Sequence, residues 1–119
     1  MNLKNMLIVV SDMDRSKRFY HDIFGLQVMR DFGDNVMLTQ GLVLQERKSW
    51  EELIGAESVT GNDVELFFEE SDWDSFMDDV DKCPENIEFI GQIRVNSWGK
   101  RAIILRDPDG HIIEVAEKK

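Results

Sequence analysis

The tetrapeptide Ser11-Asp12-Met13-Asp14 returns as Ser71-Asp72-Trp73-Asp74, sixty positions later in a chain of 119 residues. Each copy follows an apolar run and precedes a helical pattern, so the context matches as well as the letters. A repeat of this length indicates that one structural unit is used twice. A half of about sixty residues would be marginally stable alone. We therefore predict a single domain, residues 1–119, made of two units at about 1–48 and 62–119, with a linker at 49–61.

The first unit reads as a strand, a helix and three further strands. Met6–Val10 is the β-branched and apolar run of a strand. In the helix that follows, apolar side chains recur at i, i+4 spacing; Asp12 or Asp14 can cap its start, and Gly25 ends it. The other strands are expected at Leu26–Met29, Val36–Thr39 and Leu42–Glu46, the last two joined tightly around Gln40 and Gly41.

The second unit repeats this order. Val64–Glu69 is the expected strand, and Pro84 ends the helix after it. The apolar side of that helix consists of Trp73, Phe76, Met77 and Val80. Strands then follow at Ile87–Ile90, with an extension to Val95 left open, Arg101–Leu105 and His111–Val115, the last two joined by the turn Asp107–Gly110. Between the units, Ser49 and Glu52 have capping-box spacing, which predicts a short helix at Ser49–Ile54.

Strand parity separates two faces in each unit. In the second unit the apolar residues Val64, Leu66 and Phe68 should pack under the helix. The opposite face then carries Glu65, Phe67 and Glu69. Moving back sixty positions places Asn5, Leu7 and Val9 on the corresponding face of the first unit.

The last hairpins of the two units can be aligned by their glycines. Gly41 precedes Gln45 by four residues, and Gly110 precedes Glu114 by four. This alignment predicts that Gln45 and Glu114 are equivalent. If the two sheets curve around a common groove, they place together a polar quartet of Asn5, Gln45, Glu65 and Glu114.

The amino-acid composition limits the kinds of partner and the location that we expect. The net charge is −10, and most of the excess acidity lies in the second half, so nucleic acid and anionic membranes are not expected to bind. The acidity would attract cationic ligands, or it could serve solubility alone. No apolar run is long enough to span a bilayer, and no secretion signal is present, so we expect a cytoplasmic protein. Cys83, the only cysteine, excludes a disulfide framework within the chain.

Two segments give the chain a family resemblance. Val10-Ser-Asp-Met-Asp-Arg-Ser-Lys-Arg-Phe-Tyr20 with Phe24-Gly-Leu26 resembles the first strand-to-helix passage of the vicinal oxygen chelate superfamily. Trp98-Gly99 with Leu105-Arg-Asp-Pro-Asp-Gly-His-Ile-Ile-Glu114 resembles its closing hairpin. This superfamily includes glyoxalase I, bleomycin-resistance proteins and extradiol dioxygenases. The resemblance implies an α+β fold of two βαβββ units that form curved mixed sheets around a groove, and members of this length usually form homodimers.

The resemblance also implies where a metal would bind. In metal-dependent members, ligands occupy the positions matched here by Asn5, Gln45, Glu65 and Glu114. Neither His21 nor His111 falls on such a position, and both are expected to be surface or structural residues. Without imidazole the quartet does not suit a ferrous dioxygenase. Its oxygen donors would suit Mg²⁺ or Mn²⁺, with Ni²⁺ the further candidate from the family, but two of them are neutral amides, and the first expectation is no cofactor.

Two functions follow as hypotheses. The first is metal-free binding of a small cationic molecule, as in antibiotic-sequestering proteins, by a groove whose residues would be Leu7, Val9, Trp50, Phe67, Glu69 and Trp98 with the carboxylates. The second is a divalent-metal-dependent lyase, isomerase or epimerase of the glyoxalase I type. In that case Glu65 or Glu114 would move the proton.

Overall fold

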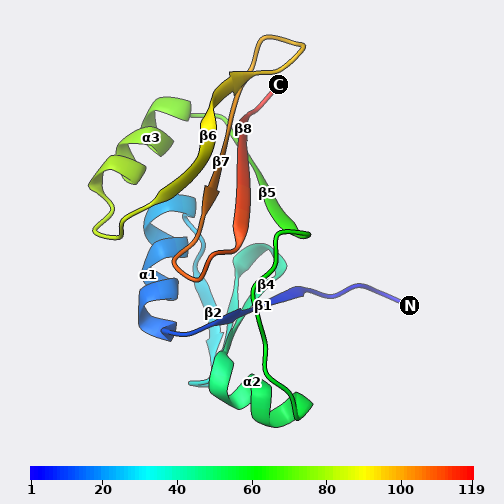
Figure 1. The fold of residues 1–119 in the computed structure, drawn as a ribbon. Coiled ribbons are helices and arrows are strands. Elements are labelled where there is room, and N and C mark those ends of the chain that lie inside the picture. Colours follow the sequence, from blue (N-terminus) through cyan, green and yellow to red (C-terminus); the bar gives the residue numbers. More distant parts are fainter. The chain divides into compact units, whose positions relative to one another are not determined.

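A computed structural model describes residues 1–119, which divide into two compact units, Met1–Val59 and Thr60–Lys119 (Figure 1). The boundary lies near the end of the expected linker, because residues 49–59 pack with the first unit. None of the helices has the length and apolar character needed to cross a membrane.

The first unit contains one four-stranded sheet, in the order β1-β4-β3-β2. Strand β1 pairs parallel to β4, whereas β3 pairs antiparallel to both β4 and β2. In chain order the elements are β1 (Met6–Val10), α1 (Met13–Phe24), β2 (Val28–Asp31), β3 (Asn35–Leu38), the 3₁₀ turn η1 (Thr39–Gly41), β4 (Leu42–Glu46) and α2 (Arg47–Ile54).

The second unit has the same topology, in the order β5-β8-β7-β6. Strand β5 pairs parallel to β8, and β7 pairs antiparallel to its two neighbours. The elements are β5 (Glu65–Glu70), α3 (Trp73–Lys82), β6 (Glu88–Val95), β7 (Arg101–Arg106) and β8 (Ile112–Glu117). The predicted α+β fold with two βαβββ units is confirmed, and each sheet is open rather than closed into a barrel.

The repeated tetrapeptide marks a strand end followed by a helix cap. Asp12 accepts a hydrogen bond from the Arg15 backbone N at 3.0 Å, and Asp72 accepts one from Ser75 N at 3.0 Å. Each carboxylate satisfies one of the free N–H groups in the first turn of its helix. The structure therefore selects Asp12 rather than Asp14 as the cap of α1. Gly25, with φ of 69°, ends that helix as predicted.

Each unit buries one side of its sheet under its first helix. The inner side of α1 contributes Phe19, Tyr20 and Ile23, all buried, and α3 contributes Trp73, Phe76 and Val80. Beneath them lie the most buried strand residues, which include Val10, Val36 and Leu44 in the first unit and Leu105, Ile113 and Val115 in the second. The edge-on contact of Trp73 and Phe76, with ring centroids 5.6 Å apart, shows how closely the inner side of α3 is packed.

Some predicted boundaries were wrong for local reasons. Helix α2 begins at Arg47 rather than Ser49, and its N-cap residue, Glu46, makes no side-chain cap. Ser49 lies inside the first turn and donates to the Glu46 carbonyl, so it is not the start of a capping box. Strand β2 begins at Val28 rather than Leu26, which is buried instead. Val64 precedes β5 and is exposed rather than packed under α3.

Candidate functional site

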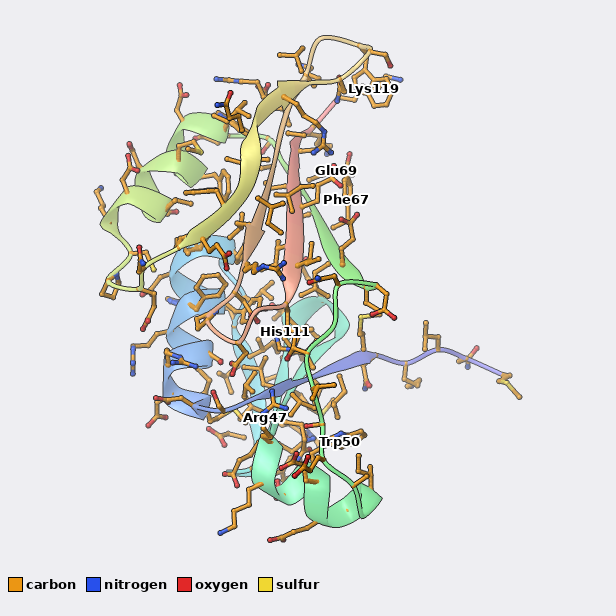
Figure 2. All side chains as sticks on the ribbon, in the orientation of Figure 1. Arg47, Trp50, Phe67, Glu69, His111 and Lys119 are labelled. Atoms are coloured by element: carbon orange, nitrogen blue, oxygen red, sulfur yellow. The ribbon has the colours of Figure 1, made fainter.

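The face of the second sheet that points away from α3 carries the predicted carboxylates. Along β5 the burial alternates, with Glu65, Phe67 and Glu69 exposed and the intervening side chains half-buried. Figure 2 shows Phe67 and Glu69 projecting from β5 on the side away from α3. We call this side the open face, and its parity is the one predicted from the sequence.

Strand register brings the second carboxylate onto the same face. Glu114 on β8 lies between Phe67 on β5 and Ile104 on β7, its two register partners. Beside it is an open pocket of about 370 Å³. Its lining combines isoleucines with polar residues that precede and begin β5: Asn62, Asp63, Val64, Glu65, Ile90, Ile104 and Ile112. An apolar wall next to convergent carboxylates is the usual composition of a small-molecule site.

Glu65 and Glu114 interact directly. Burial raises the pKa of the Glu65 carboxyl above its ordinary value, and the charge of Glu114 and a side-chain hydrogen bond to it raise it further. The guanidinium of Arg94 acts in the opposite direction. Two carboxyl groups can share a hydrogen bond only when one of them carries a proton. The pair can therefore hold a proton or exchange it for a cation.

Arg94 lies on the edge strand β6 and reaches the two carboxylates across the neighbouring strand β7. A shift of register in β6 between Ile90 and Arg94 precedes it, and its Nη2 makes an ion pair with Glu114 Oε2. The register partner of Arg94 is Ala102, which in turn is paired with Ala116. These small side chains leave room for the arginine to cross the sheet toward β8.

In the first unit the two predicted positions differ from each other. Asn5 precedes β1 and is exposed. Gln45 on β4 is only 8% exposed, and its amide is bonded at both ends. Its Oε1 accepts from Asn35 Nδ2 at 2.8 Å, and its Nε2 donates to Ser49 Oγ at 2.8 Å. Gln45 therefore ties β4 to β3 and to α2.

The alignment that equated Gln45 with Glu114 is wrong by two residues. Gln45 is paired with Val9, which the sixty-residue repeat matches to Glu69. The partner of Glu69 is Ala116, not Glu114. The chain uses two more residues after Gly110 than after Gly41 to reach the equivalent position in its last strand. The residue of the first unit that corresponds to Glu114 is Val43.

The metal positions do not form a metal site within either unit. No three His, Cys, Asp or Glu side chains converge. A metal at Gln45 would bind the amide oxygen, Oε1, and compete there with Asn35 Nδ2, while at Glu114 it would compete with the guanidinium of Arg94. A cation already held by the carboxylate opposes a second one by charge repulsion. The residues as arranged in each unit thus do not fit a divalent ion.

The remaining predicted ligand residues lie in various environments. Leu7 and Val9 are half-buried on the face of the first sheet opposite α1, and Trp50 is half-buried on α2. Trp98, in the turn between β6 and β7, is 57% exposed, and Lys119 Nζ lies 5.1 Å from its ring centroid. Neither Phe67 nor Trp98 lines the pocket of the second unit.

The histidines have structural or surface surroundings, as expected. His111 Nδ1 lies 2.7 Å from Asp107 Oδ2. The same buried carboxylate accepts the backbone N–H groups of Asp109 and His111, so it fixes the turn that leads into β8. His21 is exposed beside Asp22.

Sequence reasoning named Arg94 only as one of several candidate basic residues for an anionic substrate, and it missed the isoleucine wall and the ion pair of Arg94 with Glu114. Ile104 and Ile112 share the strand parity of Glu114, and this signal was available once β7 and β8 had been predicted. The position of Arg94 could not be read from parity, because the irregularity in β6 changes the register ahead of it.

Comparisons with known proteins agree with this topology. The glyoxalase-like domain family matches residues 3–118. A solved structure of a protein of unknown function from Agrobacterium tumefaciens is 33% identical, with a TM-score of 0.84, and the alignment covers 100% of this chain and 95% of the other. A glyoxalase-related enzyme from Fulvimarina pelagi is 18% identical, with a TM-score of 0.80 and coverage of 98% and 88%.

A lactoylglutathione lyase from Agrobacterium tumefaciens shares the fold at 20% identity, with a TM-score of 0.70 and coverage of 98% and 92%. None of the curated proteins matches the sequence. The family match spans nearly the whole chain, and the βαβββ repeat is the architecture that the resemblance implied. The chain therefore belongs to the glyoxalase-like domain family of the vicinal oxygen chelate superfamily.

Proposed function

We propose that the protein binds a small cationic molecule with an apolar body on the open face of its second sheet, without a metal. The observation that carries this proposal is the hydrogen-bonded pair of Glu65 and the half-buried Glu114 beside the wall of Ile90, Ile104 and Ile112. The carboxylates would attract the cation, and the isoleucines would cover its apolar part.

The charge balance of the site supports a cation over an anion. With both carboxyl groups ionised, the pair carries two negative charges and Arg94 supplies one positive charge, so a net negative charge remains. Asp63 adds a further acidic side chain to the lining of the pocket. Arg106, whose Nη1 donates to Oδ1 of the lining residue Asn62, is itself paired with Glu88, so it does not reverse this balance. An anionic ligand would therefore meet a net negative charge, which opposes its approach.

Isothermal titration with bleomycin-class cationic compounds tests this function. Glu65→Gln and Glu114→Gln should each weaken binding, because a neutral amide keeps the shape and removes the charge. Asp78→Asn is the matched control, since it removes an exposed charge from α3, which covers the other face of the sheet. The absence of heat with wild-type protein at high micromolar concentration would exclude this ligand class.

A divalent-metal-dependent lyase, isomerase or epimerase is the second candidate, and it requires Glu114 to exchange Arg94 for the metal ion. The raised pKa of Glu65 favours it, because a carboxyl group that titrates nearer neutrality is a better general base or acid. Here Glu65 or Glu114 would transfer the proton. Metal analysis of protein purified without a chelator decides between the two: stoichiometric metal that is lost in Glu114→Gln contradicts metal-free binding.

We further infer a cytoplasmic homodimer. Strand β2 is an exposed edge of the first sheet, and Val28 and Met29 on it and Phe32 just after it are all exposed. Uncovered apolar edges of this kind favour association with a second copy. Analytical ultracentrifugation should give twice the chain mass, and a monomer at micromolar concentration contradicts the inference.

A further inference from the structure

We infer that Arg94 is an internal counter-ion which the ligand replaces, and that the ligand therefore presents a planar amidinium or guanidinium group to Glu114. The inference deepens the proposed function and rests on it. Arg94 would determine which cations can bind, and Glu114 would be the carboxylate that binds them.

The two ion pairs of the second sheet differ in how firmly they are held. Arg101 binds Glu117 on the face under α3 through its backbone N at 2.9 Å, its Nε at 2.9 Å and its Nη2 at 3.1 Å. Its guanidinium also lies 5.3 Å from the ring centroid of Trp73. Arg94 on the open face makes a contact to Glu114 through Nη2 alone. Only the second pair is easily exchanged.

The solvent exposure of the two side chains also indicates that Arg94 is the partner that would move. The side chain of Arg94 is 49% exposed, whereas that of Glu114 is 17% exposed. If a ligand displaced Arg94, the guanidinium would move into water and keep its hydration. The carboxylate could not move in the same way, and it would need a new positive partner. The ligand's cation would therefore take over the place that the arginine leaves.

The geometry favours a planar cation. A guanidinium or amidinium presents two parallel N–H donors that match both oxygens of a carboxylate, whereas an ammonium is a point charge without this fork. Arg94 itself shows that a guanidinium fits against Glu114. The isoleucines of the pocket would then cover an aryl or alkyl body attached to the cationic group.

Benzamidine, an amidinium on an aromatic ring, is a direct probe. Arg94→Gln should bind it roughly two- to fivefold more tightly than wild type does, because an ion pair of this exposure opposes exchange by at most about 1 kcal/mol. Arg30→Gln removes one exposed positive charge from the first unit and should leave the affinity unchanged. Butylammonium should bind more weakly than benzamidine to every variant.

A measurement without ligand separates this inference from the proposed function. Arg94 lowers the pKa of Glu65, so a ¹³C NMR titration should show a higher Glu65 pKa in Arg94→Gln. An unchanged titration overturns the counter-ion role. If the wild type binds benzamidine and Arg94→Gln binds it no more tightly, the exchange of Arg94 for the ligand is wrong and the proposed function still stands. If neither protein binds any cation, the proposed function and the ligand class both fail, while a shifted titration still supports the ion pair.

Discussion

The substitution Gln45→Met separates a structural role of Gln45 from a metal-binding one. Methionine keeps the length of the side chain and removes both polar atoms of the amide. In the structure these atoms bond Asn35 Nδ2 and Ser49 Oγ, each at 2.8 Å. If Gln45 has a structural role, the substitution should lower the stability of the protein. If Gln45 is a metal ligand, the substitution should abolish metal binding.

The expected magnitude follows from the two bonds. A net contribution of about 0.5–1.5 kcal/mol for each gives a loss of roughly 1–3 kcal/mol in the free energy of unfolding. The upper part of this range applies when Asn35 stays half-buried without a new partner. For a chain of this size the midpoint of thermal unfolding should fall by about 4–12 °C.

Urea and thermal unfolding measure the change, with and without Mg²⁺, Mn²⁺ or Ni²⁺. Gln27→Met is the matched control: Gln27 is exposed, so its variant should stay within about 0.5 kcal/mol of wild type. A Gln45→Met protein as stable as wild type refutes the structural role. A divalent ion that stabilises wild type and not the variant would support a metal ligand instead.

Three further outcomes follow from the second unit and its repeat of the first. Asp12→Ala and Asp72→Ala should each lower the free energy of unfolding by about 1 kcal/mol, because their caps are alike; a thermal scan that finds only one of them destabilising contradicts the equivalence of the helix starts. Hydrogen bonds from Arg101 lower the pKa of Glu117 to about 2, so the stability it contributes is present above pH 4.5 and lost as pH falls toward 2. A ¹³C titration checks this, and Arg101→Gln should move the value back toward 4.5. Ile113→Ala, at a fully buried site on β8, should cost about 2–5 kcal/mol in urea unfolding, and a loss below 1 kcal/mol would contradict the assigned core.

The sequence predicted the fold because local and global signals agree. The strand Met6–Val10 has the predicted bounds, as has Leu42–Glu46, and the parity of β5 placed Glu65 on the correct face. Helix caps and apolar alternation are properties of neighbouring residues, so they can be read from the chain directly.

The site was harder to predict because it depends on register. A glycine marks a turn but does not fix how many residues lie between the turn and the first paired position, so Gln45 was matched to Glu114 rather than to Ala116. Likewise, an irregularity in β6 decides that Arg94 meets Glu114, and no periodic pattern signals it. Such irregularities act on single side chains, and single side chains determine the chemistry.

The register also explains why the site lies in the second unit. In the first unit the counterpart of Glu114 is Val43, which is 5% exposed, and α2 packs against β4 and β1 on that side through Ser49 and Gln45. In the second unit the only helix, α3, covers the other face. One copy of the repeat thus buries an apolar residue under a helix at this position. The other leaves a carboxylate there, with its counter-ion on an open face, where a ligand can exchange with it.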